Sequence, residues 1–108
     1  MNFSYQAEKF ACARRALMLP HTNGIAASIE YAFMECSHGM HNLSKDSLDD
    51  SARNWINVIE RFMDTSEIQD PTGRGAWLIK AEQLSVDDQM ELSRLIDELA
   101  FWFERFDG

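Results

Sequence analysis

The segment from Glu35 to His41 holds the densest group of potential metal ligands in the chain. Glu35 and His38 have the i, i+3 spacing that carboxylate-bridged two-metal sites use in helical bundles. His41 would be the third ligand of a single zinc-like site, which could be completed across an oligomer interface. These residues make a metal-binding helical bundle one hypothesis for the function.

Two features of the sequence favour a surface cluster over a metal site. A two-metal bundle takes the Glu-x-x-His motif from two helices, and this chain contains it once. In addition, helical geometry puts Glu35 and His38 on the face opposite Cys36, away from the expected bundle interior. Histidine suits the negative end of the helix dipole, so we interpret these residues as surface residues near a helix C-terminus.

Two arginines are candidates for contacting an anion. Arg14 falls within the apolar arc of the first expected helix, where its side chain either extends to solvent past Ala7 and Ala11 or pairs with a glutamate of another helix. Arg14 would also be available to a small ligand of the bundle. Arg74 lies in the loop from Pro71 to Gly75, which lacks the Gly-Lys-Ser/Thr ending of a phosphate-binding loop. We predict a structural loop, with anion binding by Arg74 as the alternative.

The cysteines and serines give no catalytic signature. Cys12 and Cys36 are the only cysteines, and the chain contains neither a Cys-x-x-Cys pair nor a Gly-x-Ser-x-Gly nucleophile elbow. Cys36 falls on the apolar arc of its helix, so we expect it to be a small buried hydrophobe. We predict no catalytic residues, no cofactor and no enzymatic activity.

Charge is distributed unevenly along the chain. Eighteen acidic and ten basic residues give a net charge of −8, whereas residues 1–20 carry three basic residues and one acidic residue. This balance argues against a nucleic-acid partner, because phosphate binding needs a basic surface. It either keeps the protein soluble or attracts a basic protein, as in neutralising proteins of the antitoxin or immunity kind. The acidic residues that would meet such a partner are Asp46, Asp49, Asp50, Glu60, Asp64, Glu67 and Asp70.

The chain shows no membrane or export segment. Arg14-Arg15 precedes a short apolar run that Pro20 ends after four residues. No stretch approaches the roughly 18 apolar residues that span a bilayer. Two cysteines in 108 residues do not make a disulfide framework. We therefore expect a cytoplasmic protein that does not bind a membrane.

The strongest helical signal runs from Ser85 to the end of the chain. Ser85 with Asp88 three residues later is close to a capping box, in which each side chain bonds to the backbone N–H of the other residue. At about 100° per residue, seven large apolar residues share an arc of roughly 120°. We expect this helix to contribute most to the core. Its apolar residues are Leu92, Leu95, Ile96, Leu99, Trp102, Phe103 and Phe106.

Two helices are predicted in the first part of the chain. The first covers residues 4–19, with Ser4 as its N-cap and with Pro20 ending it. The second covers residues 24–38, with Gly39 as its C-cap. Both should place one apolar face against the rest of the bundle.

A third helix is predicted over residues 47–64, with Ser47 as its N-cap and Asp50 completing the capping pattern. Its apolar residues cover about 160°, so we expect it to contact two neighbours and to lie centrally. Residues 76–84 fit a short helix or a strand, and we favour the helix. The sequence thus predicts a single all-α domain over residues 1–108, a compact bundle of four main helices plus this short segment before the last one.

The last helix carries a second, sparse apolar stripe. Met90 and Phe101 lie about 180° from Leu92, on the same side as Arg94 and Asp97. They are either isolated exposed residues, which are common, or a surface for self-association. We predict a homo-oligomer, with a dimer as the most frequent closed arrangement. The favoured function is a small acidic protein-interaction module. The alternative is a metal- or small-ligand-binding helical bundle that uses Glu35, His38, His41 and Arg14.

Overall fold

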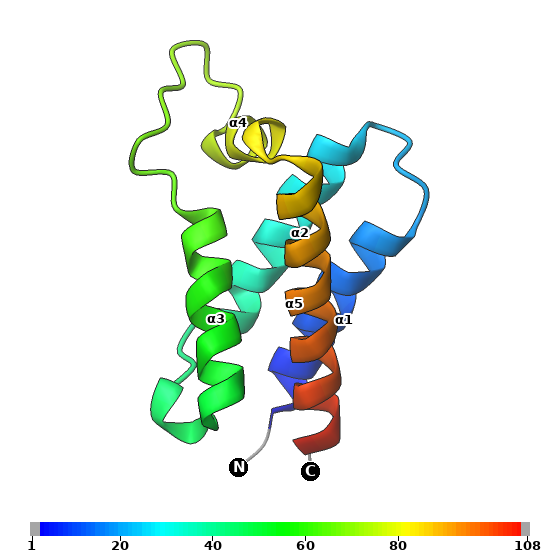
Figure 1. Ribbon diagram of the computed structural model, residues 1–108, viewed down its shortest axis with the longest axis vertical. Coiled ribbons are helices and arrows are strands. Elements are labelled where there is room, and N and C mark those ends of the chain that lie inside the picture. Colours follow the sequence, from blue (N-terminus) through cyan, green and yellow to red (C-terminus); the bar gives the residue numbers. More distant parts are fainter. Residues whose placement is uncertain (1–2, 107–108) are drawn as a thin grey trace.

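The computed structural model describes residues 3–106, which form five α-helices and no strand (Figure 1). In chain order these are α1 (Ser4–Met18), α2 (Ile25–Met40), α3 (Asp50–Met63), α4 (Ala76–Gln83) and α5 (Val86–Phe106), with the 3-10 turn η1 (Lys45–Ser47) before α3. The predicted all-α bundle is confirmed, and the segment before the last helix is helical. Among residues 3–106, none of the helices has the length and apolar character that a membrane span needs.

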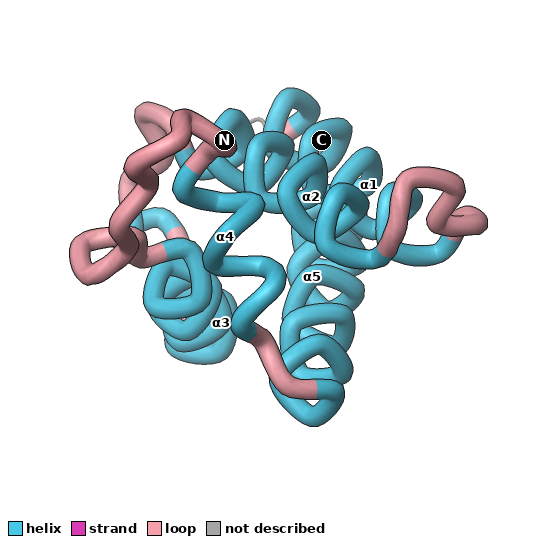
Figure 2. Tube along the Cα trace, turned by 90° about the horizontal axis from the view of Figure 1, so that it is seen from above, coloured by secondary structure: helices cyan, strands magenta, loops and turns pink. Residues whose placement is uncertain are grey.

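Helix α5 packs between α1 and α3, while α1 and α2 form a hairpin and α4 crosses one end of the bundle against α2 (Figure 2). The third helix contacts two neighbours as predicted, namely α5 and α4. The prediction that it lies centrally is wrong, because α3 lies at the edge of the bundle (Figure 1). Three residues along one margin of its apolar arc are only partly buried, namely Trp55, Val58 and Phe62. The apolar arc of α3 is therefore wider than the part of it that neighbouring helices bury completely.

The predicted apolar stripe of α5 forms the centre of the core. Leu92, Leu95, Ile96, Leu99 and Phe103 are each at most 1% exposed. Burying one such side chain contributes about 1.5–3 kcal/mol. Phe106 departs from the prediction, since it is exposed: its ring packs on Trp102, with centroids 4.6 Å apart, and the Arg105 guanidinium lies 4.7 Å from its centroid.

Side-chain caps fix the starts of two helices. The predicted box at α5 is confirmed, because Ser85 Oγ accepts from the Asp88 backbone N–H at 3.0 Å and Asp88 Oδ2 accepts from the Ser85 N–H at 3.2 Å. At α3 the predicted cap is two residues too early. Ser47 ends η1, and Asp49 caps α3 by accepting from the Ala52 N–H at 2.9 Å.

Two other helix ends differ from the prediction. Ser4 is the first residue of α1, and its N-cap position is held by Phe3, whose ring is buried 5.3 Å from that of Phe103. Gly39 does not cap α2 but lies buried inside it, where an added Cβ would be 2.9 Å from Phe10 Cε2. The glycine therefore makes room for an aromatic ring of α1, which stacks in turn on Phe103 at 5.2 Å.

Candidate functional site

Glu35 points into the protein, which corrects the prediction that it lies on the surface. It is buried, and Lys9 Nζ of α1 lies 3.7 Å from Glu35 Oε2. His38 is exposed in the last turn of α2, and His41 follows as the C-cap. Within residues 3–106 no three His, Cys, Asp or Glu side chains are grouped to hold a metal ion, so Glu35, His38 and His41 are not brought together as ligands. The cause is α1, which packs on this side of α2 and supplies the lysine.

Arg14 forms the predicted ion pair with another helix, although the partner is an aspartate. Arg14 Nη1 lies 3.5 Å from Oδ1 of Asp97, and the two side chains are 33% and 65% exposed. A pair this exposed contributes about 0–1 kcal/mol. The ion pair connects the last turns of α1 to the exposed side of α5.

The loop around Arg74 is stabilised by its own side chains. Arg74 Nη2 lies 2.6 Å from Glu82 Oε2, and this hydrogen bond raises the pKa of Arg74 and lowers the pKa of Glu82. The carboxylate of Asp70 accepts from the backbone N–H groups of Arg74 at 2.7 Å and of Gly75 at 2.8 Å. An external anion would have to displace Glu82, so the geometry fits the structural interpretation of this loop.

The predicted acidic surface is largely engaged within the fold. Lys45 Nζ lies 2.6 Å from Glu60 Oε1, and Arg53 Nη1 lies 3.2 Å from Asp50 Oδ1. These contacts hold the carboxylates in place, while the net charge of −8, which already counts the paired lysines and arginines, is unchanged. Five of the seven predicted carboxylates have partners in the described chain: Asp49, Asp50, Glu60, Asp64 and Asp70.

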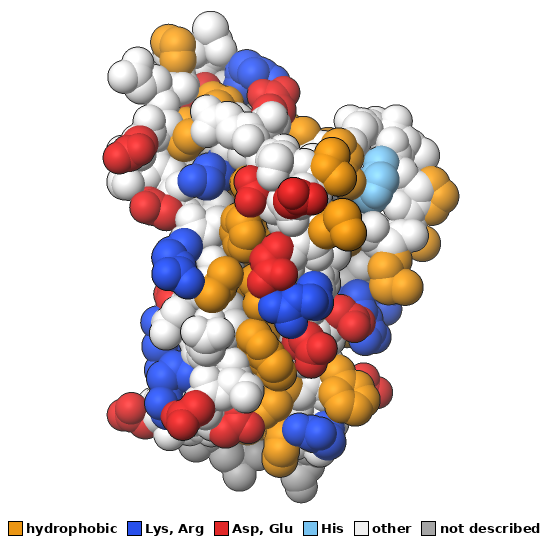
Figure 3. All heavy atoms as spheres, in the orientation of Figure 1, with side chains coloured by type: hydrophobic (Ala, Val, Ile, Leu, Met, Phe, Trp, Pro, Cys, Tyr) orange, Lys and Arg blue, Asp and Glu red, His pale blue; other side chains and the backbone are white. Residues whose placement is uncertain are grey.

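The outer side of α5 leaves large apolar side chains uncovered. Met90 is 66% exposed and Phe101 is 56% exposed. Val86, one turn before Met90, is 69% exposed, and Met18 at the end of α1 is 75% exposed. In the view of Figure 3, apolar and charged side chains lie interspersed over α5. A shallow hollow lined from both helices connects Met18 to this surface. We call these residues the α5 face: Met18, Val86, Met90, Arg94, Asp97 and Phe101.

Charged side chains separate the apolar residues of the α5 face. Arg94 holds Glu91 through two hydrogen bonds, from Nε at 3.1 Å and from Nη2 at 2.8 Å. These contacts lower the pKa of Glu91 and raise the pKa of Arg94. Asp97 is held by Arg14. The middle of the face thus carries two cations and two anions, with no excess of either charge.

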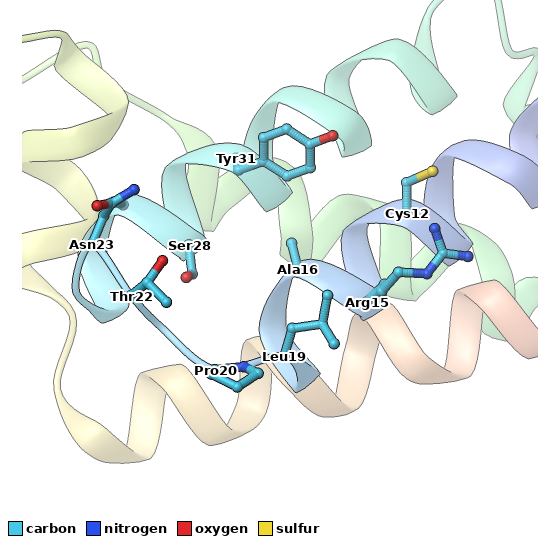
Figure 4. A pocket seen from close by; sticks show the side chains of 10 residues that line it. Cys12, Arg15, Ala16, Leu19, Pro20, Thr22, Asn23, Ser28 and Tyr31 are labelled. Carbon is cyan, nitrogen blue, oxygen red and sulfur yellow. The ribbon is translucent and has the colours of Figure 1, made fainter.

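A pocket of about 440 Å³ opens between the end of α1 and the start of α2 (Figure 4). This volume lies within the range of about 300–1,000 Å³ that is common for small-molecule sites. Sequence reasoning missed this pocket because its walls come from two helices and the turn between them, and only packing determines which faces meet. Its walls include Cys12, Arg15 and Leu19 of α1, Asn23 of the turn, and Ser28 and Tyr31 of α2.

The two cysteines have different environments. Cys36 is fully buried, and that burial, followed by the charge of Glu35, raises the pKa of its thiol. The prediction that Cys36 is a small buried hydrophobe is therefore confirmed. Cys12 is a free, half-buried thiol in the wall of the α1–α2 pocket.

No protein-family model, curated protein or solved structure matches the chain. Inferences about its function therefore rest on its own residues and their geometry.

Proposed function

We propose that this chain is a small acidic protein-interaction module of the cytoplasm, which pairs with a second copy of itself through the α5 face and catalyses no reaction. The observation that carries the proposal is the exposed apolar row of Val86, Met90 and Phe101 on α5. The opposite side of the same helix buries its apolar residues almost completely. Large apolar side chains that share one exposed helix face, with polar residues between and around them, can mark a protein contact.

The order of residues along the α5 face suits two α5 helices packed antiparallel. A two-fold axis that crosses α5 between positions 95 and 96 brings Met90 of one copy opposite Phe101 of the second copy. The same axis brings Arg94 opposite Asp97. A two-fold interface uses the same surface on both copies and must therefore be self-complementary. The α5 face meets this requirement, since apolar residues meet apolar residues and a cation meets an anion, twice per dimer.

The charged side chains are already held in position for this pairing. Arg94 uses Nε and Nη2 for Glu91, which leaves the N–H groups of Nη1 for Asp97 of the second copy. Asp97 is more than half exposed although Arg14 contacts it, so one of its oxygens is accessible. Side chains that are ordered before association lose less conformational entropy when the contact forms.

The α5 face is long enough for a stable contact. Helix α5 has 21 residues, which corresponds to a length of about 30 Å. Met18 on α1 flanks the row and widens it. Stable protein interfaces bury about 1,200–2,000 Å² in total, which two helical faces of this length with their flanking residues can supply.

A basic protein is the proposed partner of the dimer. One chain carries a net charge of −8, so two copies carry −16. Opposite charge speeds diffusional encounter, and neutralising proteins of the antitoxin or immunity kind use it in this way. Of the seven carboxylates predicted to meet such a partner, Asp46 and Glu67 are exposed and have no ion pair within residues 3–106, so they are the most available of that set.

The proposal is tested by sedimentation velocity of the untagged protein over a wide concentration range. We expect a species of twice the 12.5 kDa of one chain. Phe101→Asp should dissociate it, because a carboxylate would then face Met90 of the second copy without a partner. Met34→Asp is the matched control, because Met34 is also exposed but lies on α2, outside the α5 face.

Both variants should remain folded, since Phe101 is 56% exposed and Met34 is 37% exposed and neither belongs to the buried core. Far-UV circular dichroism of both variants checks this. A wild-type protein that stays monomeric at the highest concentration would contradict the proposal. A Phe101→Asp dimer as tight as the wild type would also contradict it, because the contact would then involve another surface.

A further inference from the structure

We propose that the α1–α2 pocket binds a small organic anion, namely a carboxylate on a compact aromatic body, with Arg15 holding the carboxylate. This site lies outside the residues that contribute the apolar row of α5. The binding of such an anion can therefore be tested independently of the proposed dimer.

Arg15 carries the only charge among the residues that line the pocket. Six of the ten basic side chains form ion pairs within the described chain, and Arg15 is not among them. No carboxylate lines the pocket either. An arginine without an acidic partner in a pocket without acids favours an anionic ligand, and its planar donors match a carboxylate.

The rest of the lining has the character expected for the body of such a ligand. Ala16, Leu19 and Pro20 supply apolar surface on one side, and the ring of Tyr31 lies across the pocket from them (Figure 4). The Ser28 hydroxyl lies 2.8 Å from His21 Nδ1, which fixes the polar end near the turn. Small-molecule sites combine apolar walls with a few convergent polar groups in this way.

The negative net charge of the chain does not prevent the α1–α2 pocket from binding an anion. The net charge is −8, but residues 1–20 carry more basic than acidic residues. Charges farther away than about 8–10 Å are largely screened at physiological salt. Arg15 is the only residue of the pocket lining that carries a full charge, so it is the charge that a ligand in the pocket would contact directly.

Cys12 provides a reporter inside the pocket. It is a free, half-buried thiol in the pocket wall, whereas Cys36 is fully buried and its raised pKa keeps it protonated. Reagents that need a thiolate should therefore modify Cys12 alone in the folded protein. Dithiobis(nitrobenzoate) is itself an aromatic carboxylate and serves as the probe, and the neutral dithiodipyridine is its control.

In the reaction, the Cys12 thiolate attacks one sulfur of the reagent, and a mixed disulfide forms. The S–S bond of the reagent breaks, and nitrothiobenzoate leaves with the electron pair. We expect one thiol to react per folded chain. Arg15→Gln should slow the reaction with dithiobis(nitrobenzoate) by about fivefold, the size expected for a partly exposed ion pair. Its reaction with dithiodipyridine should stay within about twofold, because that reagent has no carboxylate.

Arg61→Gln is the matched control, since Arg61 is another exposed arginine without an ion pair in the described chain and lies outside this pocket. It should leave both rates unchanged. If Arg15→Gln slows the two reagents equally, Arg15 acts on the thiol rather than on the anion, and the proposal is overturned.

A second measurement uses reversible ligands. Nitrobenzoate should protect Cys12 from dithiodipyridine in the wild type and lose that protection in Arg15→Gln. The neutral nitrobenzamide and inorganic phosphate should protect less, because the first lacks the charge and the second lacks the apolar body. Absence of protection by nitrobenzoate, or equal protection by all three compounds, would contradict the assignment.

Discussion

Trp102 donates its indole N–H to Oδ2 of Asp49 across 2.9 Å, and the two residues are 53 positions apart in the chain. The other oxygen of the same carboxylate accepts the Ala52 backbone N–H and so caps α3. One aspartate therefore starts α3 and fastens it to the end of α5. This contact lies beside the ring cluster that Trp102 forms with Phe3 and Phe103.

Asp49→Ala should lower the free energy of unfolding by about 2 kcal/mol, the sum of a lost N-cap and a partly buried indole N–H left without its acceptor. Asp49→Asn should cost about 1 kcal/mol, because its amide oxygen still caps α3 while its amide nitrogen cannot accept from Trp102. Urea unfolding measures both. Asp46→Ala, which removes a carboxylate without a partner, should change the value by less than about 0.5 kcal/mol. Equal effects of Asp46→Ala and Asp49→Ala would disprove this account.

Gly39→Ala should destabilise the protein although alanine is the better helix former. Alanine gains about 1 kcal/mol over glycine inside a helix. The added Cβ would lie 2.9 Å from Phe10 Cε2 and 3.2 Å from Lys9 Cβ, so α1 must shift. Overpacking of this kind costs about 1–3 kcal/mol. We expect a net loss of about 1 kcal/mol in urea unfolding, and Ser37→Ala in the same helix is the control. A more stable Gly39→Ala variant would show that α1 and α2 are not in close contact there.

Acid should weaken the fold through carboxylates that accept hydrogen bonds. The Ala52 N–H lowers the pKa of Asp49, and the Ser66 N–H lowers the pKa of Asp64. The ordinary value for both is 3.8. Since the folded state depresses these pKa values, the stabilisation is complete above the ordinary values and is lost as the pH falls through the lowered ones.

The urea midpoint should therefore stay level from neutral pH down to about pH 5 and then fall. Asp49→Ala should lose less between neutral and acid pH than the wild type, because it lacks one of the titrating groups. An identical loss in both proteins would mean that Asp49 does not contribute to the acid sensitivity.

The sequence predicted the features that depend on local periodicity. The α5 stripe from Leu92 to Phe103 and the Ser85–Asp88 box follow from residue spacing within one helix, and both are confirmed. Features that depend on which helices meet were not predictable in the same way. Glu35 was expected in solvent because its helix face is polar, yet α1 covers that face and supplies Lys9.

The pocket and the position of α3 show the same limit. Cys12 and Tyr31 lie on different helices, and nothing in either helix indicates that they line one pocket. The wide apolar arc of α3 was compatible with a central position and with an edge position whose margin is half covered. Only the packing of α5 between α1 and α3 decides between them.

Exchange of the two charges on the α5 face tests the two-fold pairing most directly. The dimer dissociation constant is measured by sedimentation for Arg94→Asp, for Asp97→Arg and for the double variant. Each single change creates like-charge contacts twice per dimer and should weaken association by about tenfold or more. The double variant restores opposite charges across the axis, although it also places a carboxylate beside Glu91 and a guanidinium beside Arg14 within each copy. It should therefore associate more tightly than either single variant by about threefold or more. A double variant as weak as the single ones, or single variants without effect, would contradict the antiparallel α5 pair.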